Sequence, residues 1–220
     1  MHEVHVGEDL RERNREIAGE NRELLRKHGV VSLNLMSAPG AGKTSLLLRT
    51  IPLLKEKFRI CVIEGDIQTR RDAERVGALG IRVYQIQTGG VCHLDAAMVH
   101  TVLHQLDLDS IDLLFIENVG NLVCPAEFDL GEDSRVMLLS VSEGDDKPKK
   151  YPLMFLESRL LILNKLDLLP HVEFDADKAK AEARDLNPYI EILEISCKTG
   201  EGIQNWITWI ENFYKNREVS

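Results

Sequence analysis

A glycine-rich octapeptide between two apolar patterns constrains the fold of this chain more than any other feature. The octapeptide, Ser37-Ala-Pro-Gly-Ala-Gly-Lys-Thr44, follows an apolar run at Val30–Met36 and precedes a helical pattern at Ser45–Lys55. A loop in that context presents backbone N–H groups to phosphate oxygens at the start of the helix. Such loops follow strands of parallel sheets, whose ligands bind beyond the carboxyl ends of the strands. The chain is therefore expected to fold around a parallel sheet.

Apolar runs alternate with helical patterns through the rest of the chain. This alternation predicts β-α-β crossovers and an α/β fold, a doubly wound and mostly parallel β-sheet with helices on both faces. The expected strands are Val30–Met36, Arg59–Glu64, Arg82–Gln87, Leu113–Asn118, Arg135–Val141, Leu160–Asn164 and Glu191–Ile195. The polar stretch from Glu143 to Tyr151 is expected to be a loop.

The beginning of the chain is highly charged. From Glu8 to Lys27 a thin apolar stripe recurs at helical spacing among charged side chains, and Gly29 is typical of a helix end. We therefore expect residues 1–29 to form an N-terminal amphipathic helical segment. Residues 30–220 are expected to form one domain, since a chain of 220 residues is long enough for a single well-buried core but short for two.

Net charge and cysteine usage narrow the classes of partner. The net charge of -9 disfavours nucleic acid and anionic membranes, because both require basic surfaces. No run reaches the roughly 20 apolar residues that cross a bilayer, and no signal peptide is recognisable, so we expect a cytoplasmic protein.

The four cysteines lie far apart in sequence at Cys61, Cys92, Cys124 and Cys197. In a reducing compartment they are expected to be core thiols or metal ligands rather than disulfides.

Each residue type in the octapeptide suits phosphate binding. Gly40 and Gly42 let the backbone approach the phosphates, Lys43 brings positive charge to the β- and γ-phosphates, and Thr44 offers a hydroxyl to Mg²⁺. Lys43 is also a candidate catalytic residue. The first position is Ser37 where the usual pattern has Gly, which is tolerable if its φ is negative. The expected phosphate-binding residues are Gly40, Ala41, Gly42, Lys43, Thr44 and Ser45.

A second motif, Asn164-Lys-Leu-Asp167, ends a buried run and specifies the base. Asp167 can accept hydrogen bonds from guanine N1–H and the 2-amino group together, which adenine cannot supply. Asn164 would bond the purine or hold neighbouring loops, and the stem of Lys165 can lie on the base. Ser196, Cys197 and Lys198 follow the last expected strand, where they would contact guanine, with Cys197 packing as a small residue. The two motifs together predict GTP rather than ATP.

Carboxylates at the ends of neighbouring strands predict a magnesium site. Asp66 and Glu117 would hold the ion or its waters beside Thr44. The backbone N–H of Gly120 could sense the γ-phosphate. Asp72 could orient the attacking water or could be an ordinary solvated carboxylate. Since Asn121, not Gln, follows Gly120, intrinsic hydrolysis is expected to be slow without a partner or second subunit.

Cysteine and histidine side chains lie beside these nucleotide motifs. Cys92 and His93 follow the strand at Arg82–Gln87, and Cys124 lies four residues beyond Gly120. Thiolate and imidazole ligands suit Zn²⁺ or Ni²⁺. A fourth ligand would be water, His100 or a second subunit; the alternative is two free thiols and a surface histidine. If the γ-phosphate moves Gly120, it moves a metal ligand too.

These motifs resemble those of the HypB family, GTPases of the dimerising P-loop class that help to insert nickel into [NiFe] hydrogenase. The resemblance spans about Val30 to Phe213 and rests on Glu64-Gly-Asp66, Gly89-Gly-Val-Cys-His-Leu-Asp-Ala96, Glu117-Asn-Val-Gly-Asn-Leu-Val-Cys-Pro125 and Asp146-Lys-Pro148 as well as the two nucleotide motifs. It implies that residues 30–220 are a P-loop GTPase domain that hydrolyses GTP with Mg²⁺. It further implies Zn²⁺ or Ni²⁺ on Cys92, His93 and Cys124, a homodimer, and as partners a HypA-like metallochaperone and the hydrogenase large subunit.

The sequence thus predicts a GTP-hydrolysing metallochaperone that couples its GTP state to nickel insertion into hydrogenase. Two alternatives stay open: a urease-type nickel-loading GTPase, and a regulatory GTP switch whose cysteines are structural. The related urease factors would show Cys-Pro-His in place of Cys92-His93. Only His2 and His5 precede the domain, so a nickel-storage tract is not expected. The physiological metal and the direction of the GTP–metal coupling stay open.

Overall fold

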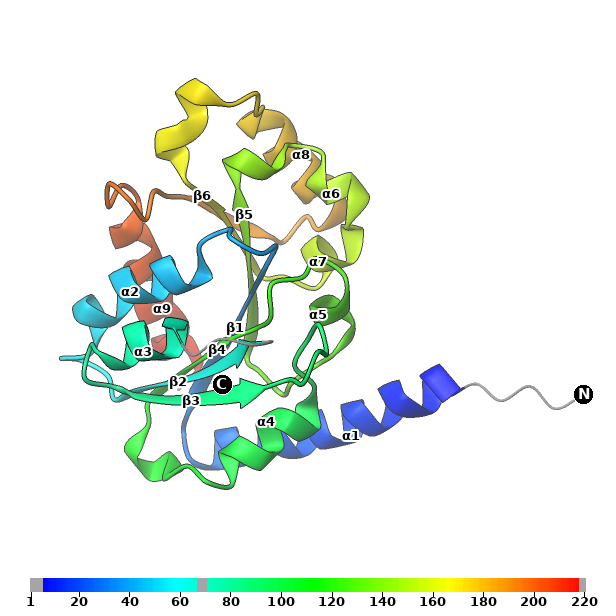
Figure 1. Cartoon of the computed structure of the whole chain (residues 1–220), viewed down its shortest axis with the longest axis vertical. Coiled ribbons are helices and arrows are strands. Elements are labelled where there is room, and N and C mark those ends of the chain that lie inside the picture. The colour runs from blue at the N-terminus through cyan, green and yellow to red at the C-terminus, as the bar shows by residue number, and fades with distance from the viewer. Residues whose placement is uncertain (1–5, 67–70, 218–220) are drawn as a thin grey trace, which may run out of the picture.

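The computed structural model describes residues 6–66 and 71–217, apart from the side chains of residues 6–9 and of Asp66. These residues build a parallel sheet of seven strands in the order β3-β2-β4-β1-β5-β6-β7 (Figure 1). The strands are β1 (Val31–Ser37), β2 (Ile60–Asp66), β3 (Arg82–Gln87), β4 (Leu113–Glu117), β5 (Ser134–Ser140), β6 (Leu160–Asn164) and β7 (Glu191–Glu194). The predicted α/β class and all seven predicted strands are confirmed.

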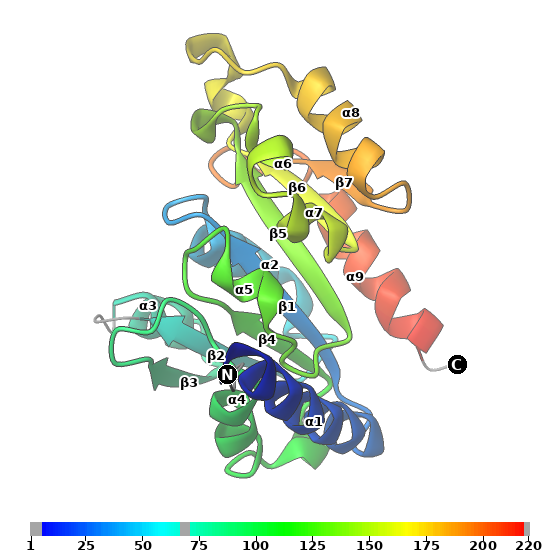
Figure 2. The same cartoon turned by 90° about the vertical axis from the view of Figure 1, so that its right-hand side faces the viewer.

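Helices cover both faces of the sheet (Figure 2). In the described part of the chain the α-helices are α1 (Val6–Lys27), α2 (Lys43–Leu54), α3 (Arg71–Gly77), α4 (Ala96–Leu103), α5 (Cys124–Glu127), α6 (Lys147–Lys150), α7 (Pro152–Leu156), α8 (Ala176–Leu186) and α9 (Ile203–Arg217). Short 3-10 helices are η1 (Leu108–Ser110), η2 (Val141–Glu143) and η3 (Leu166–His171). Helices α2, α3 and α9 lie on one face, and α1 and α4 to α8 on the other. None of the described helices is long and apolar enough to cross a membrane.

The core follows from the alternation of side chains along each strand. In β1, Leu33 and Leu35 point toward α2 and α9 and pack in one cluster with Trp206, which is fully buried. In β2, Cys61 and Ile63 point to the opposite face and pack with α1 and α4. Strands buried on both faces are expected in a parallel sheet that helices cover on each side. Burial raises the pKa of Cys61 to about 11, as expected for a core thiol.

Helix α1 is the predicted amphipathic helix, and it packs along α4 (Figure 2). Two buried asparagines fix this contact. The side chain of Asn14 accepts from the Ala96 N–H at 2.8 Å. The Asn21 amide donates to the carbonyls of Ala96 and Leu130, both at 2.9 Å.

The sheet order places the octapeptide at a topological switch point. Strand β1 pairs with β4 on one side and with β5 on the other. After β1 the chain continues to β2 and β3 at one edge of the sheet, and after β4 it crosses to β5 and continues to β7 at the other edge. Crevices beyond the carboxyl ends of strands at such points are the usual ligand sites of doubly wound sheets. One local prediction was wrong. The stretch from Glu143 to Tyr151, expected as a loop, contains the single-turn helix α6, in whose first turn Pro148 has a φ already suited to a helix.

Candidate functional site

The phosphate loop lies between the end of β1 and the start of α2. Gly40 and Gly42 have φ of 75° and 111°, values that favour glycine. A Cβ at Gly42 would lie 2.4 Å from the side-chain nitrogen of Asn164, so this position also requires glycine for space. Ser37 does not have a positive φ. A serine is therefore tolerable at this position, where the usual pattern has glycine.

Lys43 is buried beneath this loop. Its Nζ donates to the Ser37 hydroxyl at 3.0 Å, and that hydroxyl donates to the Ala38 carbonyl at 2.7 Å. The pKa of Lys43 is lowered because burial disfavours its charge, although the carboxylates of Glu117 and Glu143 oppose that shift. A buried ammonium facing a cavity is poised to gain energy from a phosphate, because phosphate would restore the lost solvation.

A cavity of about 410 Å³ opens beside the loop. Thr44 and Glu117 line it, and the Thr44 hydroxyl donates to Glu117 Oε1 at 2.7 Å. Glu64, at the end of β2, lines the same cavity and is buried. Asp66 ends β2, but its side chain lies outside the described residues, so its predicted role stays a prediction.

Asp72, in the first turn of α3, lines the same cavity as Gly42 and Lys43 of the phosphate loop. Its carboxylate pairs with Arg75 at 2.9 Å, one turn along the helix. Arg75 lines the cavity too. Asp72 therefore shares a cavity with Lys43, and its role in positioning water stays a prediction.

Two of the predicted base-reading residues are hydrogen-bonded directly to the phosphate loop. Asn164, at the end of β6, donates to the Ala41 carbonyl at 2.8 Å and accepts from the Cys197 N–H at 3.2 Å. Lys165 Nζ donates to the Gly40 carbonyl at 2.7 Å. Among the described non-glycine residues, Lys165 alone has a positive φ, 66°. Asn164 thus holds neighbouring loops together, one of its two predicted roles.

Asp167 is oriented by the loop that follows β7. The Ser196 hydroxyl donates to its carboxylate at 2.5 Å, and Lys198 Nζ lies 3.7 Å away. The Ser196 hydrogen bond, helped by Lys198, holds the pKa of Asp167 below its ordinary range. Cys197 is buried in the core, and burial raises its pKa to about 11, so it packs as a small apolar residue, as predicted.

The predicted metal ligands come together in the described structure. One ligand atom from each of Cys92, His93 and Cys124 lies within 4.8 Å of the others. The two sulfurs are 3.0 Å apart, and both thiols are free. His93 stacks on Phe128 at a ring-centroid distance of 4.0 Å, and burial lowers its pKa, which favours the neutral imidazole that binds metals. The pKa of Cys124 is raised, chiefly by its hydrogen bond with Cys92.

His100 is not part of this cluster. Its Nδ1 bonds the Asn21 side chain at 2.7 Å, and its Nε2 lies 3.0 Å from that of His104. Of the three candidates for a fourth ligand, His100 is therefore excluded in this conformation, and water and a second subunit remain.

Two asparagines that had no predicted role hold the segment between β4 and α5: Asn121 bonds the phosphate loop and Cys124, and Asn118 bonds the residue that follows His93. The Asn121 N–H donates to the Ser37 carbonyl at 2.9 Å, and its side chain accepts from the Cys124 N–H at 3.1 Å. The Asn118 side chain accepts from Leu94 N–H, beside His93, at 3.1 Å, and from Val119 N–H at 2.9 Å.

Gly120 lies between these asparagines, against the phosphate loop. A Cβ there would come 2.8 Å from Pro39 Cα, so only glycine fits. In the sequence, the segment from Asn118 to Cys124 stands out only as a run of small and amide side chains after β4. That pattern does not indicate which bonds these side chains make.

Comparisons with known proteins agree with this geometry. Residues 31–194 match the family model described as CobW/HypB/UreG, nucleotide-binding domain. The hydrogenase maturation factor HypB of Azotobacter vinelandii is 52% identical over 208 residues, which cover 94% of this chain and 69% of that protein. The crystal structure of HypB from Archaeoglobus fulgidus is similar with a TM-score of 0.86 and 43% identity, covering 92% of this chain and 98% of that one. HypB from Helicobacter pylori in complex with nickel gives a TM-score of 0.89 and 37% identity, with coverages of 93% and 96%.

Proposed function

The chain belongs to the HypB hydrogenase maturation factors of the CobW/HypB/UreG family, and from that premise we propose that it is a GTP-hydrolysing metallochaperone for nickel insertion into [NiFe] hydrogenase. The observation that carries the proposal is the short segment from Asn118 to Cys124. Within it, the Asn121 N–H donates to the Ser37 carbonyl of the phosphate loop, and the Asn121 side chain accepts from the N–H of Cys124, a predicted metal ligand. One segment that touches both sites can transmit the state of one to the other.

Guanine recognition is assigned to Asp167, which Ser196 and Lys198 orient. The ionised carboxylate would accept two hydrogen bonds from guanine, and the low pKa of Asp167 keeps it ionised. Lys43 and the loop N–H groups would hold the phosphates.

Mg²⁺ fits the residues beside the phosphates. The Thr44 hydroxyl and the Glu117 carboxylate lie 2.7 Å apart and offer only oxygen, the donor that this ion prefers. Thr44 and Glu117 would hold the ion, with Asp66 as a further proposed ligand. When bound, Mg²⁺ supplies positive charge that offsets the charge developing on the phosphates.

Hydrolysis requires an oriented water and a stabilised leaving group. Lys43 is the proposed stabilising residue, since its ammonium is buried at the phosphate side of the cavity. Asp72 is the proposed water-positioning residue, once it leaves Arg75. That pairing supports slow hydrolysis in the isolated subunit and faster hydrolysis when a second subunit or a partner rearranges α3.

The metal cargo, Ni²⁺ or Zn²⁺, is assigned to Cys92, His93 and Cys124. Val91 and Val123, each next to a cysteine, are 39% and 51% exposed. An apolar rim around three ligands supports a homodimer in which a second half-site completes the coordination. A HypA-like metallochaperone and the hydrogenase large subunit are the proposed donor or acceptor of the metal, in the cytoplasm.

The base assignment is tested with Asp167→Asn. The amide reverses the donor–acceptor pattern at guanine N1, so GTP binding should be lost and xanthosine triphosphate binding gained. Phosphate release and fluorescent-nucleotide affinity should be measured with GTP, ATP and xanthosine triphosphate. Unchanged GTP affinity in this variant would remove the guanine assignment.

Metal titration separates this function from a regulatory switch with structural cysteines. Stripped protein should rebind Ni²⁺ or Zn²⁺, and Cys92→Ala should weaken that binding. If the stripped protein rebinds neither ion and Cys92→Ala changes nothing, the regulatory switch is the better description.

A deletion strain decides between the two maturation pathways. Loss of hydrogenase maturation supports the proposal, and loss of urease maturation alone supports the urease-type factor.

A further inference from the structure

A pair of histidines lies on one face of α4, away from the cysteine cluster. His100 and His104 are one helical turn apart, and the His104 N–H donates to the His100 carbonyl at 3.2 Å, which continues the helix through both residues. Their Nε2 atoms are 3.0 Å apart, and the ring centroids are 4.4 Å apart. Two ring nitrogens at that distance need a proton or a cation between them.

The buried side chain of Asn21, on α1, fixes which nitrogen of His100 carries a proton. Both hydrogens of the Asn21 amide are used, because its nitrogen donates to the carbonyls of Ala96 and Leu130. Its oxygen must therefore be the acceptor for His100 Nδ1, at 2.7 Å. Nδ1 carries the hydrogen, and the lone pair of Nε2 points toward His104. A carbonyl oxygen on the other ring nitrogen is the usual support of a metal-bound histidine.

A carboxylate from α1 lies beside the pair. Glu20 Oε2 is 4.0 Å from His100 Nε2, and the Glu20 side chain is 66% exposed, so it can rotate closer. Two imidazole nitrogens bound tetrahedrally at about 2.0–2.1 Å lie roughly 3.3 Å apart, near the spacing already present. Imidazole with carboxylate is a ligand set that suits Zn²⁺ and Ni²⁺.

We propose that His100, His104 and Glu20 form a second site for a divalent transition-metal ion, Zn²⁺ or Ni²⁺, with water completing the coordination. The ion takes the place of the hydrogen between the two Nε2 atoms: that hydrogen leaves His104 Nε2 for solvent, and Nδ1 of the same ring takes one up from solvent, so both imidazoles stay neutral and no net proton is released. The site joins α1 to α4. It uses no thiolate and no residue of the segment from Asn118 to Cys124. Its affinity is therefore independent of the bound nucleotide, unlike that of the cysteine cluster.

The test uses the full chain with the cysteine cluster removed by Cys92→Ser and Cys124→Ser. His2→Gln and His5→Gln are added, because these two histidines lie outside the described residues and are metal ligands of the same type. Equilibrium dialysis against Zn²⁺ or Ni²⁺ should show one ion bound per chain. His104→Ala should weaken binding by about tenfold or more, as expected for the loss of one ligand. His104 is exposed and does not contact Asn21, so its replacement leaves the α1–α4 hydrogen bonds in place.

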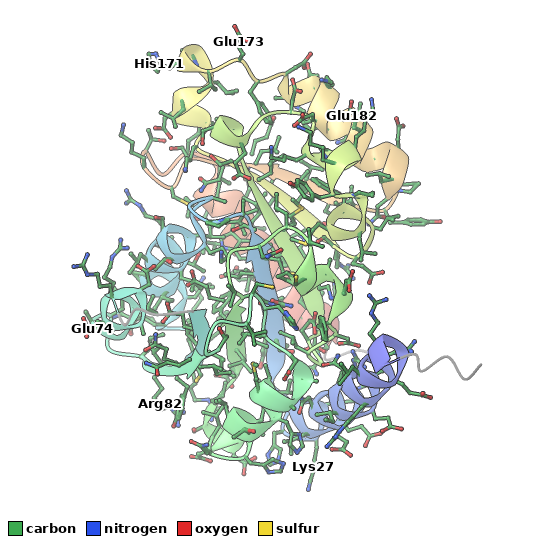
Figure 3. All side chains as sticks on the ribbon, turned by 45° about the vertical axis from the view of Figure 1, so that its right-hand side comes forward. Lys27, Glu74, Arg82, His171, Glu173 and Glu182 are labelled. Carbon is green, nitrogen blue, oxygen red and sulfur yellow. The ribbon has the colours of Figure 1, made fainter. Side chains whose placement is uncertain are left out.

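His171→Ala is the matched control. His171 is an exposed histidine at the opposite end of the molecule from Lys27, the last residue of α1 (Figure 3). Binding should survive this change, and Co²⁺ bound to the background protein should give no thiolate charge-transfer band. Glu20→Gln should weaken binding several-fold, and an unchanged affinity would remove the carboxylate from the site.

Thermal unfolding gives a readout that does not depend on counting ions. Added Zn²⁺ should raise the Tm of the background protein, because the ion joins α1 to α4 and binds only the folded chain. Added Zn²⁺ should not raise the Tm of the background protein that also carries His104→Ala. The proposal is overturned if the background protein binds no ion, if His104→Ala binds as tightly as the background, or if GDP and a GTP analogue give different affinities.

Discussion

Gly42 shows how one residue connects the phosphate loop to the base-reading loop. With a φ of 111° and Asn164 2.4 Å from where a Cβ would lie, alanine at this position would strain the backbone and displace the Asn164 amide. Gly42→Ala should therefore lower GDP affinity by about tenfold or more and cost about 1–3 kcal/mol of stability. Fluorescent-nucleotide titration and urea unfolding measure the two effects.

Gly40→Ala is the control for that prediction. Gly40 also has a positive φ, 75°, but no described atom lies within 4 Å of a Cβ built there. It should carry the backbone strain alone and lose less affinity than Gly42→Ala. Equal losses in the two variants would mean that contact with Asn164 does not matter.

Ser196 sets the lower pH limit of the proposed guanine binding. Its hydrogen bond depresses the pKa of Asp167, so the ionised carboxylate persists at low pH and is lost only as pH falls through that depressed value. Ser196→Ala should return the pKa of Asp167 toward that of an ordinary aspartate and shift the acid limb of GDP binding to higher pH. Near neutral pH the two proteins should bind alike. Thr199→Ala, in the same loop, should keep the original profile, and superimposable profiles for Ser196→Ala would contradict this role.

At the residue scale, the sequence identified side chains whose chemistry is specific. Asp167, Lys43 and Cys92 were predicted because few other residue types could do what their motifs require. Asn118 and Asn121 were not predicted. Their importance lies in bonds to distant segments, from the Asn118 side chain to Leu94 and from the Asn121 N–H to the Ser37 carbonyl, and an asparagine in a loop does not indicate its partners.

Among the elements, the connection between β4 and α5 carries the proposed coupling. The Asn121 side chain accepts from the N–H of Val123, the N-cap residue of α5, at 2.7 Å and from that of Cys124, its first residue, at 3.1 Å. Asn121→Ala should release Cys124, weaken metal binding by about tenfold, and bring the ratio of metal affinities in the GDP and GTP-analogue states toward one. Isothermal titration in both states measures this.

Asn121→Asp separates coupling from simple destabilisation. A carboxylate keeps the acceptor for both N–H groups, so the ratio of affinities should be restored. An alanine variant that still shows the full nucleotide effect would exclude this connection as the link.

Element boundaries were predictable to within a residue or two because each strand is an apolar run between polar loops. Strand β6 illustrates this, since Leu160–Asn164 was predicted and observed with the same bounds. Helix α6 was missed because four residues, Lys147–Lys150, are too few for a helical pattern and three of them are lysine.

For the whole molecule, the order of the strands was beyond the sequence. The insertion of β4 between β1 and β2 places the Asn118–Cys124 segment next to the phosphate loop. A sequence that gives seven similar apolar runs does not say which become neighbours, because every strand is compatible with either side of β1. The strand ends alone predicted that the proposed nucleotide and metal sites lie at the same edge of the sheet. The sheet order was needed to show that the segments that carry them are in contact.

The central claim is that the bound nucleotide controls the metal. The most direct test measures Ni²⁺ and Zn²⁺ affinity of the full chain saturated with GDP and with a non-hydrolysable GTP analogue, with molecular mass recorded in each state. We expect different affinities in the two states and a difference that disappears in Cys124→Ala. Equal affinities in both states, for both metals, would contradict it.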